Sequence, residues 1–75
     1  MTDEQKIEAF DRVRAAANAK TTSLQQAMEA ADSLVARGQI KHDRKAVQNT
    51  ASKLSEFIIM GNQSEFDKLI AEFEG

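Results

Sequence analysis

The residues that could perform acid–base chemistry are few in this chain. The single histidine, His42, is followed directly by Asp43. A catalytic site of this type needs a nucleophile, a base and an orienting group that converge through the fold, and adjacency in sequence does not supply that convergence. We therefore interpret His42 as a solvated side chain and predict no catalytic residue.

Two pairs of carboxylates have a spacing of three residues, Glu8 with Asp11 and Glu29 with Asp32. This spacing places each pair on one face of a helix. A metal site of the helical-bundle type needs Glu-x-x-His repeats, which do not occur here. The chain also has no cysteine, no aspartate-rich calcium loop and no glycine-rich phosphate loop. We therefore predict neither a metal nor a cofactor.

Charge is distributed unevenly over the second half of the chain. Residues 37–53 carry five cations against one acid, whereas residues 54–75 carry five acids against one cation. The basic segment is a solvated face or an intrachain partner of the acidic tail, a contact for an acidic protein, or a contact for nucleic-acid phosphates. The net charge of −2 and the absence of Trp and Tyr argue against nucleic acid.

Four consecutive apolar residues, Phe57-Ile58-Ile59-Met60, cannot all lie on one stripe of a helix. At 100° per residue, Ile59 and Met60 fall well away from the stripe that contains Leu54 and Ile58. Either a third helix folds back over these two side chains, or they belong to an exposed patch that binds another chain. Methionine adapts well to binding surfaces, which favours the second interpretation.

The elements that position these groups are predicted to be helices. Alanine and long unbranched side chains dominate the composition, and no segment shows the two-residue alternation of a strand. Thr2 to Gln5 has the pattern of a capping box. The first helix is therefore predicted from Asp3 to about Arg37, with Gly38 as its C-terminal signal.

The apolar stripe of this first helix keeps its phase across Thr21-Thr22-Ser23. A loop normally resets the phase, so we predict one continuous helix, with a break at Thr21–Ser23 as the alternative. Residues 39–42 are then a short connector, which makes the second helix an antiparallel neighbour of the first. Asp43 is its predicted N-cap, and the helix is expected to end at Met60.

A short third helix is predicted after Gly61. Ser64 to Asp67 resembles a capping box with Asp in place of Glu. Four apolar residues then share one face: Phe66, Leu69, Ile70 and Phe73. The chain is thus predicted to be an all-α protein with a long N-terminal helix, an antiparallel second helix and a short third helix.

Oligomerisation is the remaining means of stabilisation for so short a chain. A domain of 75 residues buries only a modest share of its surface, and no disulfide or metal supplements its core. The predicted second helix is also too short to cover the first. We therefore predict a homodimer, with the following interface residues: Phe10, Val13, Ala17, Leu24 and Met28.

The combined features favour a non-enzymatic inhibitor or adaptor that occludes a surface of a larger protein. Its expected partner-binding residues are Phe57, Ile59, Met60, Arg37, Lys41, Arg44 and Lys45. The alternative is a nucleic-acid-binding protein that applies the basic segment 37–53 to the phosphate backbone. The chain has neither a membrane-length apolar run nor an apolar N-terminal leader, so we expect one cytoplasmic domain over residues 1–75.

Overall fold

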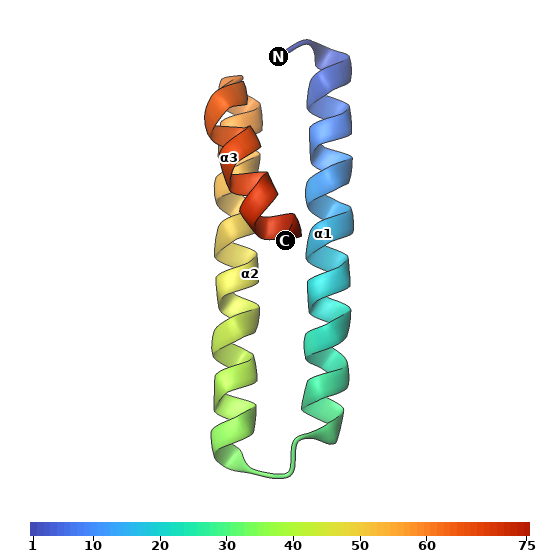
Figure 1. Ribbon diagram of the computed structural model, residues 1–75, viewed down its shortest axis with the longest axis vertical. Helices are drawn as coiled ribbons and strands as arrows, with labels where there is room; N and C mark the ends of the chain where they lie inside the picture. Colours follow the sequence, from blue (N-terminus) through green and yellow to red (C-terminus); the bar gives the residue numbers. More distant parts are fainter.

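The computed structural model describes all 75 residues and contains three α-helices and no strand. The helices are α1 (Asp3–Ala30), α2 (Leu34–Met60) and α3 (Gln63–Glu74). α1 and α2 form an antiparallel hairpin in a rod 46 Å long, and α3 folds back along one half of that hairpin (Figure 1). The predicted all-α architecture with three helices is confirmed.

The start of α1 agrees with the sequence pattern. The Thr2 hydroxyl oxygen accepts from the Gln5 backbone N–H at 3.2 Å, and the Thr2 N–H donates to Gln5 Oε1 at 2.8 Å. The capping box is therefore complete, and Asp3 and Glu4 occupy the first turn, where the helix dipole favours acids. The helix continues without a break through Thr21–Ser23, so the broken-helix alternative is wrong.

The end of the first helix is where the sequence-based boundaries are wrong. α1 stops at Ala30 instead of about Arg37, and Ala31 adopts an extended conformation. Ser33 then caps α2, since its hydroxyl oxygen accepts from the Ala36 N–H at 3.1 Å. Gly38, the predicted helix terminator, lies inside α2.

The predicted connector at residues 39–42 is likewise helical. Asp43, the predicted N-cap, lies in the middle of α2, where its carboxylate accepts from the Gln39 side-chain amide at 3.0 Å. The reason lies in packing. A turn at residues 31–33 makes α1 and α2 almost equal in length, 28 and 27 residues, so each covers the other along the whole rod. A turn at residues 38–42 would leave a long part of α1 without a partner.

The end of α2 agrees with the prediction. Gly61 has a φ of 72°, the left-handed conformation that glycine adopts without steric cost, and its N–H donates to the last turn of α2. Asn62 replaces Ser64 as the N-cap of α3, since its side-chain oxygen accepts from the Glu65 N–H at 3.3 Å. The connection between α2 and α3 therefore contains only two residues.

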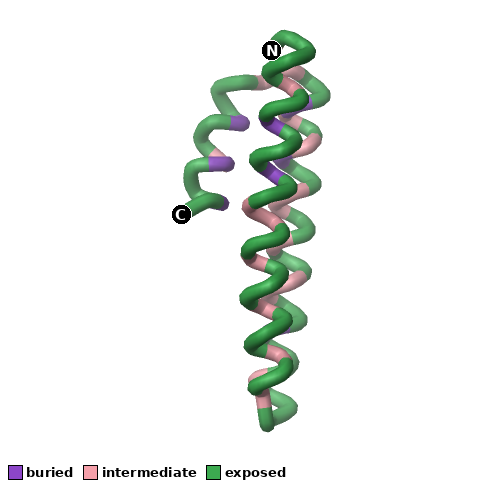
Figure 2. Tube along the Cα trace, turned by 90° about the vertical axis from the view of Figure 1, so that its right-hand side faces the viewer, coloured by how far each residue is buried: buried purple, intermediate pink, exposed green.

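The buried core lies where all three helices meet, between α3 and the hairpin (Figure 2). α3 contributes its predicted stripe, with Phe66, Ile70 and Phe73 buried and Leu69 half-buried. The hairpin contributes Ala9, Val13, Leu54 and Ile58. Outside this cluster only Ile40 is buried, at the seam between α1 and α2.

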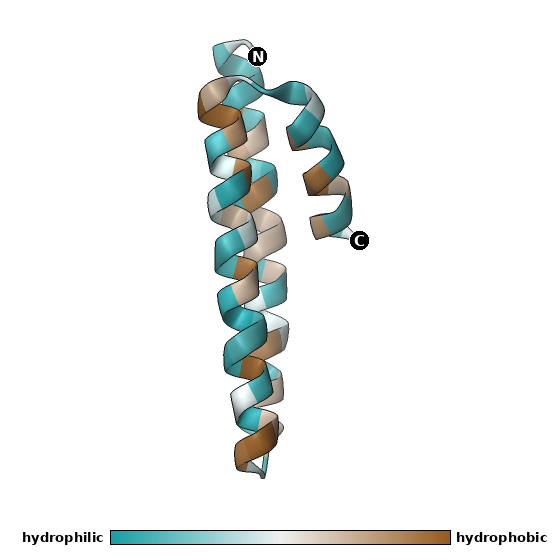
Figure 3. Ribbon diagram, turned by 90° about the vertical axis from the view of Figure 1, so that its left-hand side faces the viewer, coloured by the Kyte–Doolittle hydropathy of each residue, from teal (hydrophilic) through white to brown (hydrophobic).

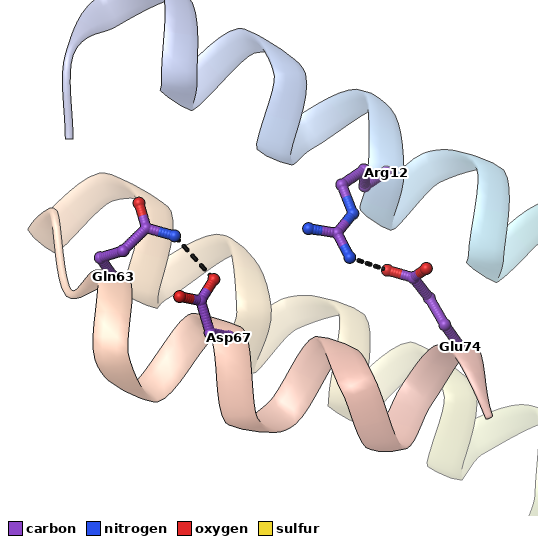
Figure 4. A network of polar contacts seen from close by, with 4 residues as sticks. All are labelled: Arg12, Gln63, Asp67 and Glu74. Atoms are coloured by element: carbon purple, nitrogen blue, oxygen red, sulfur yellow. Dashed lines mark hydrogen bonds and ion pairs between the residues drawn. The ribbon is translucent and has the colours of Figure 1, made fainter.

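We call residues 1–17 and 47–75 the three-helix half of the rod, and residues 18–46 the two-helix half. α3 is attached to the three-helix half by its apolar face and by an ion pair from Arg12 on α1 to Glu74 in the last turn of α3 (Figure 4). Both side chains are about half exposed, so the pair orients α3 more than it stabilises the fold. On the same side of α3 as Glu74, toward α1, Gln63 donates to Asp67 at 2.7 Å (Figure 4).

Candidate functional site

The groups considered for chemistry remain apart in the structure. His42 is exposed on α2, whereas Asp43, 100° further round the helix, is half-buried and held by Gln39. Asp32 lies in the turn after α1, so the expectation that Glu29 and Asp32 share a helix face is wrong. No group of three or more His, Cys, Asp or Glu side chains lies close enough together to hold a metal ion.

Two shallow hollows lie beside the last turn of α3. One is between α1 and α3, and the other extends to Val47 and Thr50 on α2. Lys20 borders both, with its ammonium nitrogen 5.3 Å from the centre of the Phe73 ring, a cation–π arrangement. Each hollow contains one carboxylate and no histidine, so neither brings together a pair of groups for general acid–base chemistry.

The side of the hairpin turned away from α3 has no helix over it (Figure 2), and we call it the open face. α3 contacts α1 near Arg12 and Ala16 and contacts α2 near Thr50 and Phe57. The helix period of 100° per residue places a different set of residues on the opposite side. The open face carries Ile7, Phe10, Arg14, Thr21, Gln25 and Met28 from α1, and Arg37, Lys41, Arg44, Lys45, Gln48, Ser55 and Ile59 from α2.

Four of the five predicted basic residues form a stripe along this face. Arg37, Lys41, Arg44 and Lys45 follow one another at helical spacing within α2, and none of them makes an ion pair. Arg44 is half-buried and donates to Gln25 Oε1 at 3.0 Å, while its Nε is buried without a partner. Lys53 lies on the other side of α2, next to α3.

The acidic tail does not pair with this basic stripe. α3 lies on the opposite side of the hairpin, and its ion pairs connect Glu74 with Arg12 and Glu65 with Lys68. Intrachain pairing with the acidic tail is therefore wrong for these four residues, whereas the alternative of a solvated face agrees with the exposure of Arg37, Lys41 and Lys45. Arg37, Lys41 and Lys45 are exposed to solvent on a surface that α3 does not reach.

The apolar run at the end of α2 is divided between core and surface. Ile58 is fully buried, and Phe57 is half-buried against the core. Ile59 and Met60 are 70% and 74% exposed, so α3 does not fold back over them and that interpretation is wrong. Ile59 lies on the open face, whereas Met60 points toward the α3 side at the same end of the rod.

The residues predicted for a dimer interface line the seam between α1 and α2. Val13 belongs to the buried core, and Ala17 packs against it. Leu24 and Met28 are half-buried in the two-helix half, and Phe10 is 37% exposed at the edge of the open face. Four of the five therefore border the open face; Val13 does not.

Sequence reasoning missed three exposed apolar residues. Ile7 is 62% exposed on the open face, and Leu34 and Val35 are 86% and 85% exposed at the start of α2. Figure 3 shows apolar ribbon at both ends of α2. Ser33 is the signal that could have found Leu34 and Val35, because a helix that starts after this serine places both residues in its first turn, at the tip of the hairpin.

No family model, no curated protein and no solved structure matches this chain. None of the three helices combines the length and the apolar character that crossing a bilayer requires.

Proposed function

We propose that this chain is a non-enzymatic regulator, an inhibitor or adaptor, that covers a surface of a larger protein with its open face. The observation that carries the proposal is the combination of uncovered apolar side chains, Ile7, Phe10 and Ile59, with a stripe of four cations that have no anionic partner in the chain. Exposed apolar residues beside unpaired charge are typical of interaction surfaces.

The chemistry of the open face supports an acidic partner. The apolar residues at the end of the rod would fill a groove or cover an apolar strip on the partner, and their burial would supply most of the affinity. Arg37, Lys41 and Lys45 would meet carboxylates and set the orientation and the association rate. In this mechanism the chain acts by occlusion, because a rod 46 Å long covers a wide area of whatever it binds.

We also propose that the chain forms a homodimer. Its accessible surface is 5286 Å², whereas a compact protein of 8.3 kDa exposes about 4,600 Å². Its radius of gyration is 14.2 Å, against about 11 Å for a compact domain of this length. The surplus surface supports a molecule that shares apolar area with another chain.

The proposal is tested by capture with matched variants. A tagged form of the chain captures its partner from an extract of the native host, and the purified partner is then titrated with the wild type and with two open-face variants, K41E/K45E and I59D. We expect at least tenfold weaker binding for both. The charge-matched control K53E/K68E changes the α3 side and should bind like the wild type. Unchanged binding by both open-face variants would show that the proposal is wrong.

The second candidate function is binding to the nucleic-acid backbone. The observation that favours it is the placement of Arg37, Lys41, Arg44 and Lys45 on one stripe of α2. Such a protein would be retained on duplex DNA at low salt, and its affinity would fall steeply as salt rises. We expect no retention at low salt, and retention that disappears in K41E/K45E would favour this second function over the first.

A further inference from the structure

The rod has opposite net charge in its two halves. Without α3, which lies on the other side of the hairpin, the three-helix half (residues 1–17 and 47–60) holds five acidic and four basic side chains, a net charge of −1. The two-helix half holds five basic and three acidic side chains, a net charge of +2. Two copies packed side by side in the same direction would bring like charge together, whereas two copies in opposite directions would place each positive half beside a negative half.

The apolar residues along α1 are spaced almost symmetrically about Ala17, as an antiparallel pair requires. Phe10 and Leu24 lie seven residues before and after Ala17 on α1, and Ile7 and Met28 lie ten and eleven residues from it. Ala17 is near the middle of α1, which spans residues 3–30. A two-fold axis at the level of Ala17 would therefore bring Phe10 of one copy to Leu24 of the other, and Ile7 to Met28.

The residues that α2 contributes to the open face are also spaced symmetrically, about Gln48 near the middle of the helix. Lys41 and Ser55 lie seven residues on either side of it, and Arg37 and Ile59 lie eleven residues on either side. In an antiparallel pair, the aliphatic stem of Arg37 would cover the exposed Ile59 of the other copy. Lys41 would lie beside Ser55 and its neighbour Glu56, which is exposed and makes no ion pair within the chain.

We propose that a second copy of this chain occupies the open face, packed antiparallel about a two-fold axis that passes near Ala17 and Gln48. The inference rests on the proposed function, since it assigns a self-association to the same surface. The rod measures 46 by 17 Å, so the outline of one face covers at most about 780 Å². A stable protein interface buries about 800 Å² on each partner, so this dimer would use nearly the whole length of the face.

In this dimer the open face of each copy is covered by the other, so a larger partner gains access only when the two copies separate. Self-association therefore regulates the docking surface: a dilute chain presents it and a concentrated chain hides it. α3 stays on the outside of the pair in both copies, with its acidic outer surface in solvent.

Single-cysteine variants test the orientation directly, because the chain contains no cysteine of its own. Each variant is treated with a short thiol-reactive cross-linker at a concentration where sedimentation shows the dimer. We expect Q48C to cross-link to itself, because it lies at the axis. We expect K41C and S55C to cross-link only when the two are mixed, since each lies about 10 Å along the helix from the axis.

Three outcomes would contradict the antiparallel dimer. Sedimentation as a monomer up to high micromolar concentration would overturn it, as would efficient self-cross-linking of K41C, which would indicate a parallel pair. A Q48C variant that cross-links only at the background rate of a cysteine on the α3 side, such as K68C, would also contradict it. Circular dichroism confirms that each variant is folded.

Charge exchange tests the same contact without cysteine. K41E/K45E places acids beside Glu56 of the other copy, so its self-association should weaken at least tenfold, and E56K, which places a cation beside Lys41, should weaken likewise. An equimolar mixture of the two restores opposite charges across both contacts and should form a heterodimer close to wild-type strength. Failure of the mixture to associate would overturn the proposed pairing.

Failure of the dimer and failure of the proposed function are distinguishable. If the chain is monomeric but I59D loses its partner, the open face is a docking surface without self-association, and only the proposed dimer is wrong. If Q48C and the K41C–S55C mixture cross-link as expected but the open-face variants still capture the partner, the antiparallel dimer stands and the proposed function fails.

Discussion

The two halves of the rod are held together very differently. In the three-helix half, seven buried side chains form one cluster to which every helix contributes. In the two-helix half, Ile40 alone is buried, and the seam is otherwise made of half-buried side chains such as Leu24 and Met28. The comparison shows that a helical hairpin cannot enclose a core by itself, and that α3, although only 12 residues long, provides most of the enclosure.

The largest effect should come from removing the central side chain of α3. Phe66 of α3 is 1% exposed and packs against the hairpin within the core cluster. Replacement by alanine should lower the free energy of unfolding by about 3–5 kcal/mol, which is enough to release α3 and expose Leu54 and Ile58. Chemical denaturation followed by circular dichroism measures the change. A loss below 1 kcal/mol would contradict the assignment of the core to the three-helix half.

A smaller loss is expected for the same kind of truncation in the two-helix half. Ile40 is 9% exposed and is covered by α1 alone. Ile40→Ala should therefore cost about 2 kcal/mol, at the low end for a buried isoleucine, because the half-buried side chains around it can move into the space. Hydrogen exchange should show faster opening of residues 18–46 than of the three-helix half, in the wild type and more so in this variant. Uniform protection along both helices would contradict the comparison.

The sequence was sufficient to predict the elements governed by local signals. The Thr2–Gln5 capping box, the unbroken phase across Thr21–Ser23 and the left-handed Gly61 are all decided within one or two turns of the chain. The turn between α1 and α2 could not be predicted in the same way. Gly38 is a stronger local stop signal than Ala31–Ser33, but matching the lengths of the two helices is a property of the whole hairpin, and it prevails over the cost of a glycine within a helix.

The two internal glycines provide a matched pair, one in each half. Gly61 has a φ of 72°, and a Cβ there would meet its nearest neighbour only at 3.8 Å, so the cost of a side chain arises from the backbone conformation. Gly61→Ala should destabilise the fold by about 1 kcal/mol and loosen the connection that directs α3 onto the core. Thermal unfolding detects this as a lowered midpoint. A neutral result would show that α3 does not depend on this turn.

The smallest effect, and one of opposite sign, is expected in the two-helix half. Gly38 lies inside α2, and a Cβ built on it meets nothing within 4 Å. Gly38→Ala should therefore raise the free energy of unfolding by about 0.5–1 kcal/mol. The same thermal experiment measures it. A destabilisation instead would restore the sequence-based interpretation of Gly38 as the end of the first helix.

The candidate site was only partly accessible from the sequence. Ile59 and Met60 could be identified because their phase is incompatible with the stripe of their own helix, and the structure leaves both exposed. The basic residues were recognised as a cluster. Their alignment on one stripe requires that α2 begins at Leu34, and the sequence-based turn at residues 39–42 would have interrupted it. Which side of the hairpin α3 covers is decided by packing at Gly61 and Phe57, and no local pattern reports it.

The two short connections, residues 31–33 and 61–62, determine how the chain folds as well as how it is shaped. Each helix has its main partner in a helix adjacent to it in the sequence, so little loop-closure entropy opposes the first contacts. The chain also contains no proline, which removes the slow isomerisation step that delays many small proteins. Refolding should therefore be complete within milliseconds and without a slow phase, as is typical of proteins whose contacts are local in sequence.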